Sequence, residues 1–340
     1  MTIAKPDLPK TYLDQVQLCR DVVEGEPAVK SRTRDSLPPL PSHITKPARY
    51  KAFLDRATFF NASARTLSGL VGAVFRKTPI IQNSTPTLSQ KLALNDTTPE
   101  GQSLVSFSEP LVEEVLWTGR VGLLLDRPGE DESDSRPFAV LYKTEAIFPH
   151  TTVLSNRTRK LTSVLLREAK DDPSSTPLDP KDPITVFRLL SLDEEGFYYQ
   201  QVFDEDLSPI SERIYLLNQG RKIDYIPFIG ITPSNLSLTP EKPPLLDIAT
   251  LNISHFRSYA ALEHGRMYTA FPQYYVSFKA DSIMAPPLDN SGSEESAGET
   301  PYSVDADSVW EVEGGTPGIL EFNGSGLNSL ENAIEAKAGQ

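Results

Sequence analysis

The sequence predicts an α+β fold in which helices precede a meander of antiparallel strands. Three observations support this. Apolar residues recur at steps of three and four near the front of the chain, which is the spacing of a helix with one buried face. Short runs of β-branched and aromatic residues follow, separated by turn residues. A long helical segment comes only after these runs, so helices and strands do not alternate as in a parallel sheet.

The composition indicates a globular protein without the usual signature of a tight nucleic-acid binder. Of the 340 residues, 39% are hydrophobic and 23% are charged, and the formal net charge is -13. Tight DNA binding needs an excess of Lys and Arg for the phosphates, so we expect any DNA to be handled loosely. The alternative is that the negative charge serves only solubility.

Cysteine usage and hydropathy exclude several further classes of protein. The single cysteine, Cys19, excludes an intrachain disulfide and a cysteine-based metal site, and a cytosolic compartment fits. The first residues contain no apolar signal core. No stretch reaches the roughly 18 apolar residues of a membrane span, so we expect no membrane partner.

The N-terminal part of the sequence predicts a Pro-rich arm followed by a long helix. A short helix over Thr11–Val23 lies in a Pro-rich segment, and Pro38–Pro41 favours an extended conformation. Docking of these prolines to a recognition module is the alternative to a plain extended arm. Residues 50–76 have continuous helical spacing. Gly69 and Gly72 lower its helix propensity, which predicts close approach of another backbone.

A further helix and the strands come next. The helix covers residues 102–119, with Gly119 as its C-cap. Asp193–Gly196 is a predicted hairpin turn, and the segments RIYLLNQG and IDYIPFIGI close the meander. The predicted strands are Val121–Asp126, Phe138–Phe148, Leu161–Ala169, Ile184–Leu192 and Phe197–Phe203.

A long helix follows the strands, between Pro243-Pro244 and Pro272. Some 27 residues would give a helix of about 40 Å. Its apolar stripe packs either against neighbouring copies of the chain, which we favour, or against the core of the same chain. The stripe ends at Phe271, and its candidate interface residues are Ala249, Ile253, Phe256, Ala260, His264 and Met267.

Catalytic equipment is missing from the sequence. It contains no Walker-type GxxxxGK[ST] motif, no GxGxxG, no GxSxG and no HExxH. His255 and His264 are nine residues apart, on roughly opposite faces of the long helix, and cannot bind one metal together. We expect both to be packing or interface residues. We therefore expect that the protein is not an enzyme and that it binds no cofactor and no metal.

Four segments, in the same order, resemble the portal protein of tailed bacteriophages, which connects head and tail. They are "ARYKAFLDRATFFNASARTLSGLVGAVFRKTP", "VLWTGRVGLLLDRP", "IDYIPFIGITPSN" with "PPLLDIATLNISHFRSYA", and "VWEVEGGTPGILEFNGSGLNSLENAIE". The likeness covers about residues 48–340. These patterns are descriptive and carry no catalytic signature.

The resemblance implies a division of the chain into portal segments. The family continues into a tunnel loop and a crown, so we expect this sequence to be a piece of a longer protein. The implied segments are an N-terminal arm (1–48), a wing of helices and β meander (49–242), a first stem helix (243–271), a small β-containing clip (272–322) and the start of a second stem helix (323–340).

The resemblance also implies a function. Portal proteins form a ring, usually of twelve subunits, at one capsid vertex of the virion, after assembly in the host cytoplasm. Double-stranded DNA passes through the ring without sequence-specific binding during packaging and ejection. Terminase, head-tail adaptor proteins and the major capsid or scaffold protein are the implied partners. Contact with terminase and adaptors falls to the clip, where the candidate residues are Tyr274, Tyr275, Phe278 and Trp310.

Two other functions stay open at this stage. The chain could be another virion structural or interaction protein that does not form the ring. It could also be a hydrolase whose site is too diffuse to recognise. The mass of the assembled protein separates the first alternative from the portal, and a pocket with converging perturbed acids would be needed for the second.

Overall fold

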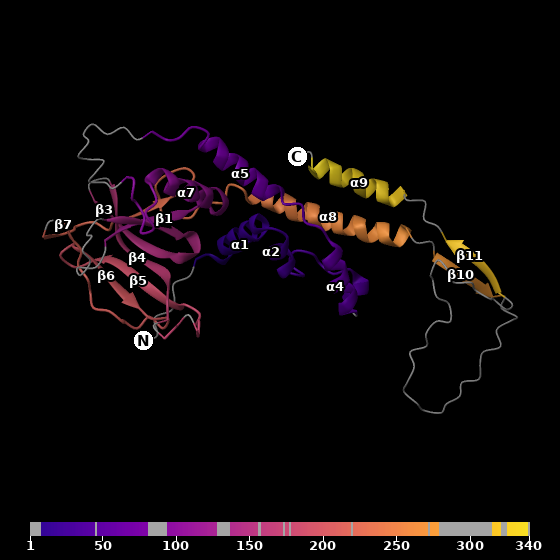
Figure 1. Ribbon diagram of the computed structural model, residues 1–340, viewed down its shortest axis with the longest axis horizontal. Coiled ribbons are helices and arrows are strands. Elements are labelled where there is room, and N and C mark those ends of the chain that lie inside the picture. Colours follow the sequence, from indigo (N-terminus) through magenta and orange to yellow (C-terminus); the bar gives the residue numbers. More distant parts are fainter. Residues whose placement is uncertain are drawn as a thin grey trace, which may run out of the picture. The chain divides into compact units, whose positions relative to one another are not determined.

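A computed structural model of the chain has the predicted α+β architecture (Figure 1). It describes residues 8–44, 46–80, 94–127, 137–155, 158–172, 174–176, 178–218, 220–270, 273–278, 315–320 and 325–338. The chain forms two compact units, and the division falls within the long helix. Unit 1 comprises Met1–Ser36 and Phe59–Ile253, and unit 2 comprises Leu37–Thr58 and Ser254–Gln340.

Two antiparallel sheets form the body of unit 1. The strands are β1 (Val121–Asp126), β2 (Phe138–Lys143), β3 (Ile147–Ser155), β4 (Thr158–Lys170), β5 (Ile184–Leu192), β6 (Tyr198–Phe203), the short pair β7 (Leu217–Asn218) and β8 (Arg221–Lys222), and β9 (Phe228–Ile231). One sheet has the order β2-β1-β9 and the other the order β3-β4-β5-β6.

Most of the strand predictions are confirmed. The exception is Phe138–Phe148, which contains β2, a 3-10 turn at Thr144–Ala146 and the beginning of β3. The turn lets the chain leave one sheet and enter the other. The predicted hairpin turn after β5 is confirmed, because the Asp193 carboxylate accepts hydrogen bonds from the backbone N–H groups of Glu195 and Phe197.

The helices in the described part of unit 1 are α1 (Lys10–Glu24), α2 (Glu26–Ser31), α5 (Ala62–Val74), α7 (Leu104–Thr118) and the beginning of α8 (Leu246–Ala270). The prediction for α7 is confirmed. Its C-cap Gly119 has the left-handed φ of 77° that favours glycine. A Cβ at this position would lie 2.5 Å from the carbonyl oxygen of Glu241, so the close approach of that backbone also requires glycine.

The prediction of a single helix over residues 50–76 is wrong. Two helices occupy it: α4 (Pro47–Arg56), which belongs to unit 2, and α5. The backbone becomes extended at Ala57, and the Asn61 side chain caps α5 by accepting a hydrogen bond from the Ala64 N–H at 2.9 Å. The apolar spacing runs through this break, so periodicity alone could not reveal it.

The expected close approach at Gly69 and Gly72 is also wrong within the part of the chain that the structure describes. No atom lies within 4 Å of a Cβ built at either glycine. Both glycines belong to an exposed face of α5.

The short helix predicted over Thr11–Val23 is confirmed as α1, and with α2 it makes residues 10–31 helical rather than an extended arm. Helix α1 buries Tyr12, Val16, Cys19 and Val22 in unit 1. Farther along, Pro41 begins the short helix α3 (Pro41–Ile44). The buried apolar face of α1 holds this segment in unit 1, although the prolines and charges around it are typical of an exposed arm.

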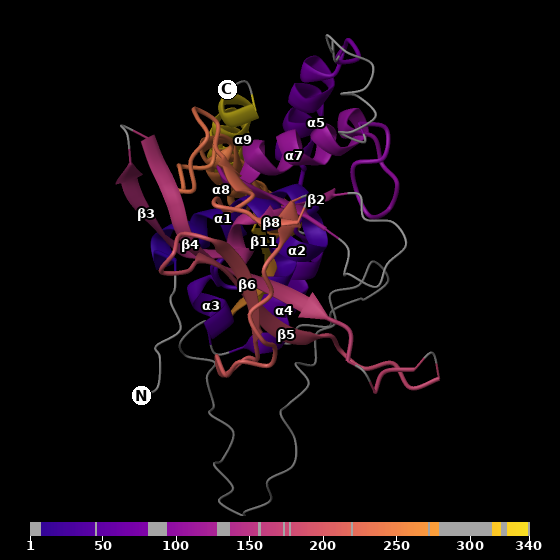
Figure 2. The same cartoon turned by 90° about the vertical axis from the view of Figure 1, so that its left-hand side faces the viewer.

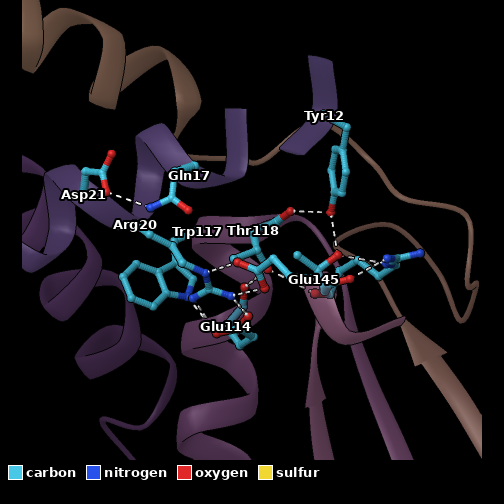
Figure 3. Close-up of polar contacts among 10 residues, drawn as sticks. Tyr12, Gln17, Arg20, Asp21, Glu114, Trp117, Thr118 and Glu145 are labelled. Carbon is cyan, nitrogen blue, oxygen red and sulfur yellow. Dashed lines mark hydrogen bonds and ion pairs between the residues drawn. The ribbon is translucent and has the colours of Figure 1, made fainter. Parts of the chain in front are cut away.

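Polar contacts fix α1 to the rest of unit 1 (Figure 3). The Tyr12 hydroxyl donates to the carbonyl oxygen of Thr118 at 2.8 Å. The Arg20 guanidinium donates to the carboxylates of Glu114, at 2.5 Å, and Glu145, at 2.7 Å. Burial alone would raise the pKa of Glu145, but the hydrogen bonds and charge of Arg20 hold it below its ordinary value. These contacts tie α1 to α7 and to the 3-10 turn.

The two sheets share one apolar core, and Arg120 lies at its edge. Arg120 is 1% exposed. Its guanidinium donates to the Thr144 hydroxyl at 2.9 Å and to the carbonyl oxygens of Thr144, Ile147 and Leu238 at 2.7, 2.9 and 2.8 Å. The buried members of the core are Leu124, Tyr142, Ile147, Val164, Leu166, Leu190, Tyr198, Ile226, Phe228 and Leu238.

Unit 2 contains α3, α4, the rest of α8, the paired strands β10 (Gln273–Phe278) and β11 (Gly315–Leu320), and α9 (Ser325–Ala338). Strand β11 and helix α9 both lie in the segment VWEVEGGTPGILEFNGSGLNSLENAIE. Residues 279–314, between β10 and β11, lie outside the described residues.

The packing of the two sheets makes a prediction about glycine. At Gly122 on β1, an added Cβ would lie 2.4 Å from Phe228 Cζ and 2.8 Å from Ile147 Cδ1, both in the buried core. Overpacking of this kind costs about 1–3 kcal/mol, so we expect Gly122→Ala to lower the free energy of unfolding by that amount.

The matched control is Gly69→Ala, in open space on a helix. We expect it to raise the free energy of unfolding by up to about 1 kcal/mol. Urea denaturation of both variants measures the two effects. Equal effects, or a stabilised Gly122→Ala variant, would contradict the packing described for β1.

Candidate functional site

The long helix α8 is the element on which the proposed assembly depends, and Asn252 fixes it in unit 1. This side chain is 5% exposed. Its Oδ1 accepts hydrogen bonds from the backbone N–H groups of Ala62 and Ser63, each at 3.1 Å, and from the Ser63 hydroxyl. Its Nδ2 donates to the carbonyl oxygen of Phe60 at 2.8 Å. The first N–H groups of a helix have no partner within it, so Asn252 caps α5 from 189 residues away.

Apolar packing supports the same junction. Leu67 and Val71 of α5 form a small buried cluster with Leu245, just before α8. Ile248 of α8 and Trp117 of α7 pack against this cluster. Helices α5, α7 and the beginning of α8 therefore share a second core within unit 1.

In unit 2, α9 runs antiparallel to α8, and Figure 1 shows the two side by side. The Lys337 ammonium donates to the Ser258 hydroxyl at 2.7 Å. Nearer the other end of the pair, Arg266 forms an ion pair with Glu331 at 2.5 Å. Leu327 packs over Gly265, where a built Cβ would lie 2.8 Å from its Cδ2. From Glu331 to Lys337 on α9 the partners on α8 go from Arg266 back to Ser258, which defines the antiparallel return.

The predicted interface stripe of α8 is largely covered within the chain itself. Ala249, Ile253, Phe256 and Ala260 are 1%, 7%, 0% and 2% exposed. This burial is what the alternative of internal packing predicts. Met267, in contrast, is 41% exposed. Its contact with a neighbouring copy stays a prediction.

His264 packs in a ring cluster that the sequence did not reveal. Its ring lies 5.1 Å from that of Phe53 on α4 and 5.5 Å from that of His43 on α3, both in an edge-on arrangement. Burial lowers the pKa of His264, and the nearby His43 and Arg56 lower it further. A cavity of ≈ 390 Å³ lined by Phe53, Arg56, His264 and Met267, among others, adjoins the cluster.

His255 has a separate environment. Its ring stacks on Tyr259, one turn along α8, with the centroids 6.2 Å apart. Burial lowers its pKa, as does the charge of Lys337. Within the described ranges, no three His, Cys, Asp or Glu side chains gather where they could hold a metal ion.

The predicted clip residues are only partly described. Tyr274, Tyr275 and Phe278 lie on β10, opposite Ile319, Gly318 and Gly315 of β11. Trp310 lies outside the described residues. None of the helices in the described part of the chain has the length and apolarity needed to cross a membrane.

Comparison with known proteins identifies no family for this chain. No protein-family model matches the chain. No curated protein matches it either. The similar solved structures include a chain of the virion of a native gene transfer agent particle and chains of the necks of empty and native particles, computed with C6 and C12 symmetry. The matches cover 81% of this chain and 62–64% of those chains, at 12–13% identity and TM-scores of 0.35–0.37. The chain thus spans less than two thirds of their length, and a likeness at these values carries no argument about function.

The hydrogen bonds of Asn252 predict that shortening this one side chain lowers the stability of the protein strongly. Asn252→Ala would leave buried N–H groups of α5 and the Phe60 carbonyl without their partner. We expect the free energy of unfolding to fall by about 2–4 kcal/mol, from a lost cap and unsatisfied buried groups. Denaturation followed by circular dichroism measures this.

The control is Asn328→Ala, an exposed asparagine of α9. We expect it to change stability by less than about 0.5 kcal/mol. Equal effects of the two substitutions would show that Asn252 does not cap α5.

Proposed function

We propose that this chain is a portal-type subunit, which forms a ring at one vertex of a phage-like particle and serves as the conduit for the genome. The strongest support is the antiparallel return of α9 along α8 after the paired strands β10 and β11. The resemblance implies this order of stem helix, clip and second stem helix. On this proposal α5, α7 and the antiparallel sheets of unit 1 belong to the wing.

The proposed role requires no chemistry of its own. The conduit would let double-stranded DNA slide, and the net charge of -13 suits such a surface because it offers few phosphate contacts. On this proposal β10 and β11 belong to the part that meets terminase and the head-tail adaptors. Capsid or scaffold protein would surround the ring in the virion.

One observation favours the second candidate, an interaction protein of the particle that does not form a ring. Four of the six stripe residues of α8 are buried within a single chain, so α8 does not need a neighbouring copy to cover them. Under this candidate the same α+β body would bind its partners as a monomer.

The mass of the purified protein, measured by light scattering with negative-stain images of the same sample, separates the candidates. We expect ring particles with a central hole. Met267→Glu places a charge on the exposed part of the stripe, and we expect it to lower the fraction of rings because the interface would have to bury that charge. A protein that stayed monomeric even with capsid and scaffold protein present would overturn the ring.

A further inference from the structure

Three aromatic rings from three helices meet in unit 2. Helices α3 and α4 lie side by side (Figure 2). The ring of His43 on α3 lies 5.1 Å from that of Phe53 on α4 and 5.5 Å from that of His264 on α8. The rings of Phe53 and His264 are also 5.1 Å apart. Edge-on ring contacts of this kind are favourable, so the cluster holds α3 and α4 against α8.

The hydrogen bond of His43 requires its neutral form. The side chain is buried, with 4% of it exposed. Its Nδ1 accepts a hydrogen bond from the backbone N–H of Leu40 at 3.4 Å. A neutral imidazole has one nitrogen that can accept, whereas both nitrogens of a charged imidazole donate. A proton on Nδ1 would therefore break the contact between His43 and the chain just before α3.

The surroundings of His264 also disfavour a charged ring. Arg56 of α4 lines the same cavity of ≈ 390 Å³ as His264. Burial lowers the pKa of His264, and the charges of His43 and Arg56 lower it further. If both histidines were protonated, three positive charges would gather where α3, α4 and α8 meet.

The carboxylates near the cluster already have cationic partners. Glu263, which lines the same cavity, forms an ion pair with Arg266 at 2.8 Å. Glu331 of α9 pairs with the same arginine at 2.5 Å. Arg266 itself lines the cavity and adds positive charge there. These groups therefore offer little compensation for a proton on His264.

We propose that His43 and His264 form a pH-sensitive switch between the helix pair α3–α4 and helix α8. While both rings are neutral, the cluster holds the pair on α8. When acid charges them, Leu40 loses its acceptor and the positive charges repel one another. Helices α3 and α4 then separate from α8 and expose the buried side chains of Phe53 and Ala260. The switch lies within a single chain, so it does not depend on the proposed ring.

The direction of the pH dependence follows from His264. A free histidine has a pKa of about 6.5. Because the pKa of His264 is lowered in the closed form, this ring takes up a proton when the contact opens. Opening is therefore favoured as the pH falls below about 6.5, by up to about tenfold per pH unit for each extra proton that the open form binds.

Hydrogen exchange of the backbone amides in the full-length chain, at about pH 7.5, 6.5 and 5.5, tests the switch. Protection factors remove the intrinsic pH dependence of exchange. We expect the protection of α4 to fall about tenfold between pH 6.5 and 5.5. Helix α1, in unit 1, should keep its protection over the same range.

Two variants remove the titrating rings and keep their contacts. His264→Phe retains an edge-on ring beside Phe53. His43→Asn retains an oxygen that can accept from the Leu40 N–H. Each should reduce the fall in protection of α4, and the double variant should abolish it. The matched control is His255→Gln, on the same helix but stacked on Tyr259, and we expect it to leave the fall unchanged.

Several results would overturn the switch. One is equal protection of α4 at about pH 6.5 and 5.5 in the unchanged protein. Another is a fall that persists in the double variant or disappears in His255→Gln. A fall that begins only below about pH 5 would also count against it, because protonation of Glu263 and Glu331 would then be the cause. If one of the single variants does not fold, the other one decides.

Discussion

A buried guanidinium is the interaction on which the rest of unit 1 depends. Arg120 follows the C-cap of α7 directly and stands just before β1. It donates to the chain at the 3-10 turn, at the start of β3 and at Leu238, before α8. A buried charge is costly unless hydrogen bonds replace its water, and the planar fork of arginine can reach several carbonyl oxygens at once where a lysine cannot. The two sheets, the helical layer and the approach to α8 therefore meet at one side chain.

The N-terminal helix joins the same point. The Tyr12 hydroxyl contacts the Thr144 hydroxyl, which also accepts a hydrogen bond from Arg120. Arg20 adds its ion pairs to α7 and the 3-10 turn. Because α1 supplies these groups, residues Lys10–Glu24 belong to the body of unit 1. In a ring, such a body would hold the beginning of α8 in a fixed orientation, which suits a helix that serves as a strut.

The sequence predicted the elements well where one local signal sufficed. Gly119 ended α7 as expected, and Asp193 made the expected turn. The prediction failed where contacts between distant segments determine the structure. The break between α4 and α5 depends on helix caps, and one of them is the side chain of Asn252. Arg120 and Asn252 look like ordinary polar residues in the sequence, because their partners lie up to 118 and 192 residues away. The same holds for His43, which meets His264 only in the folded chain.

Arg120 holds α1, the start of β3 and the segment around Leu238 as one body. Hydrogen exchange of the backbone amides in Arg120→Lys, compared with the unchanged protein, tests it most directly. A lysine keeps the charge but loses the fork. We expect these three regions to lose protection from exchange together, while α9 keeps its own. Loss confined to the residues next to position 120 in the sequence would contradict it.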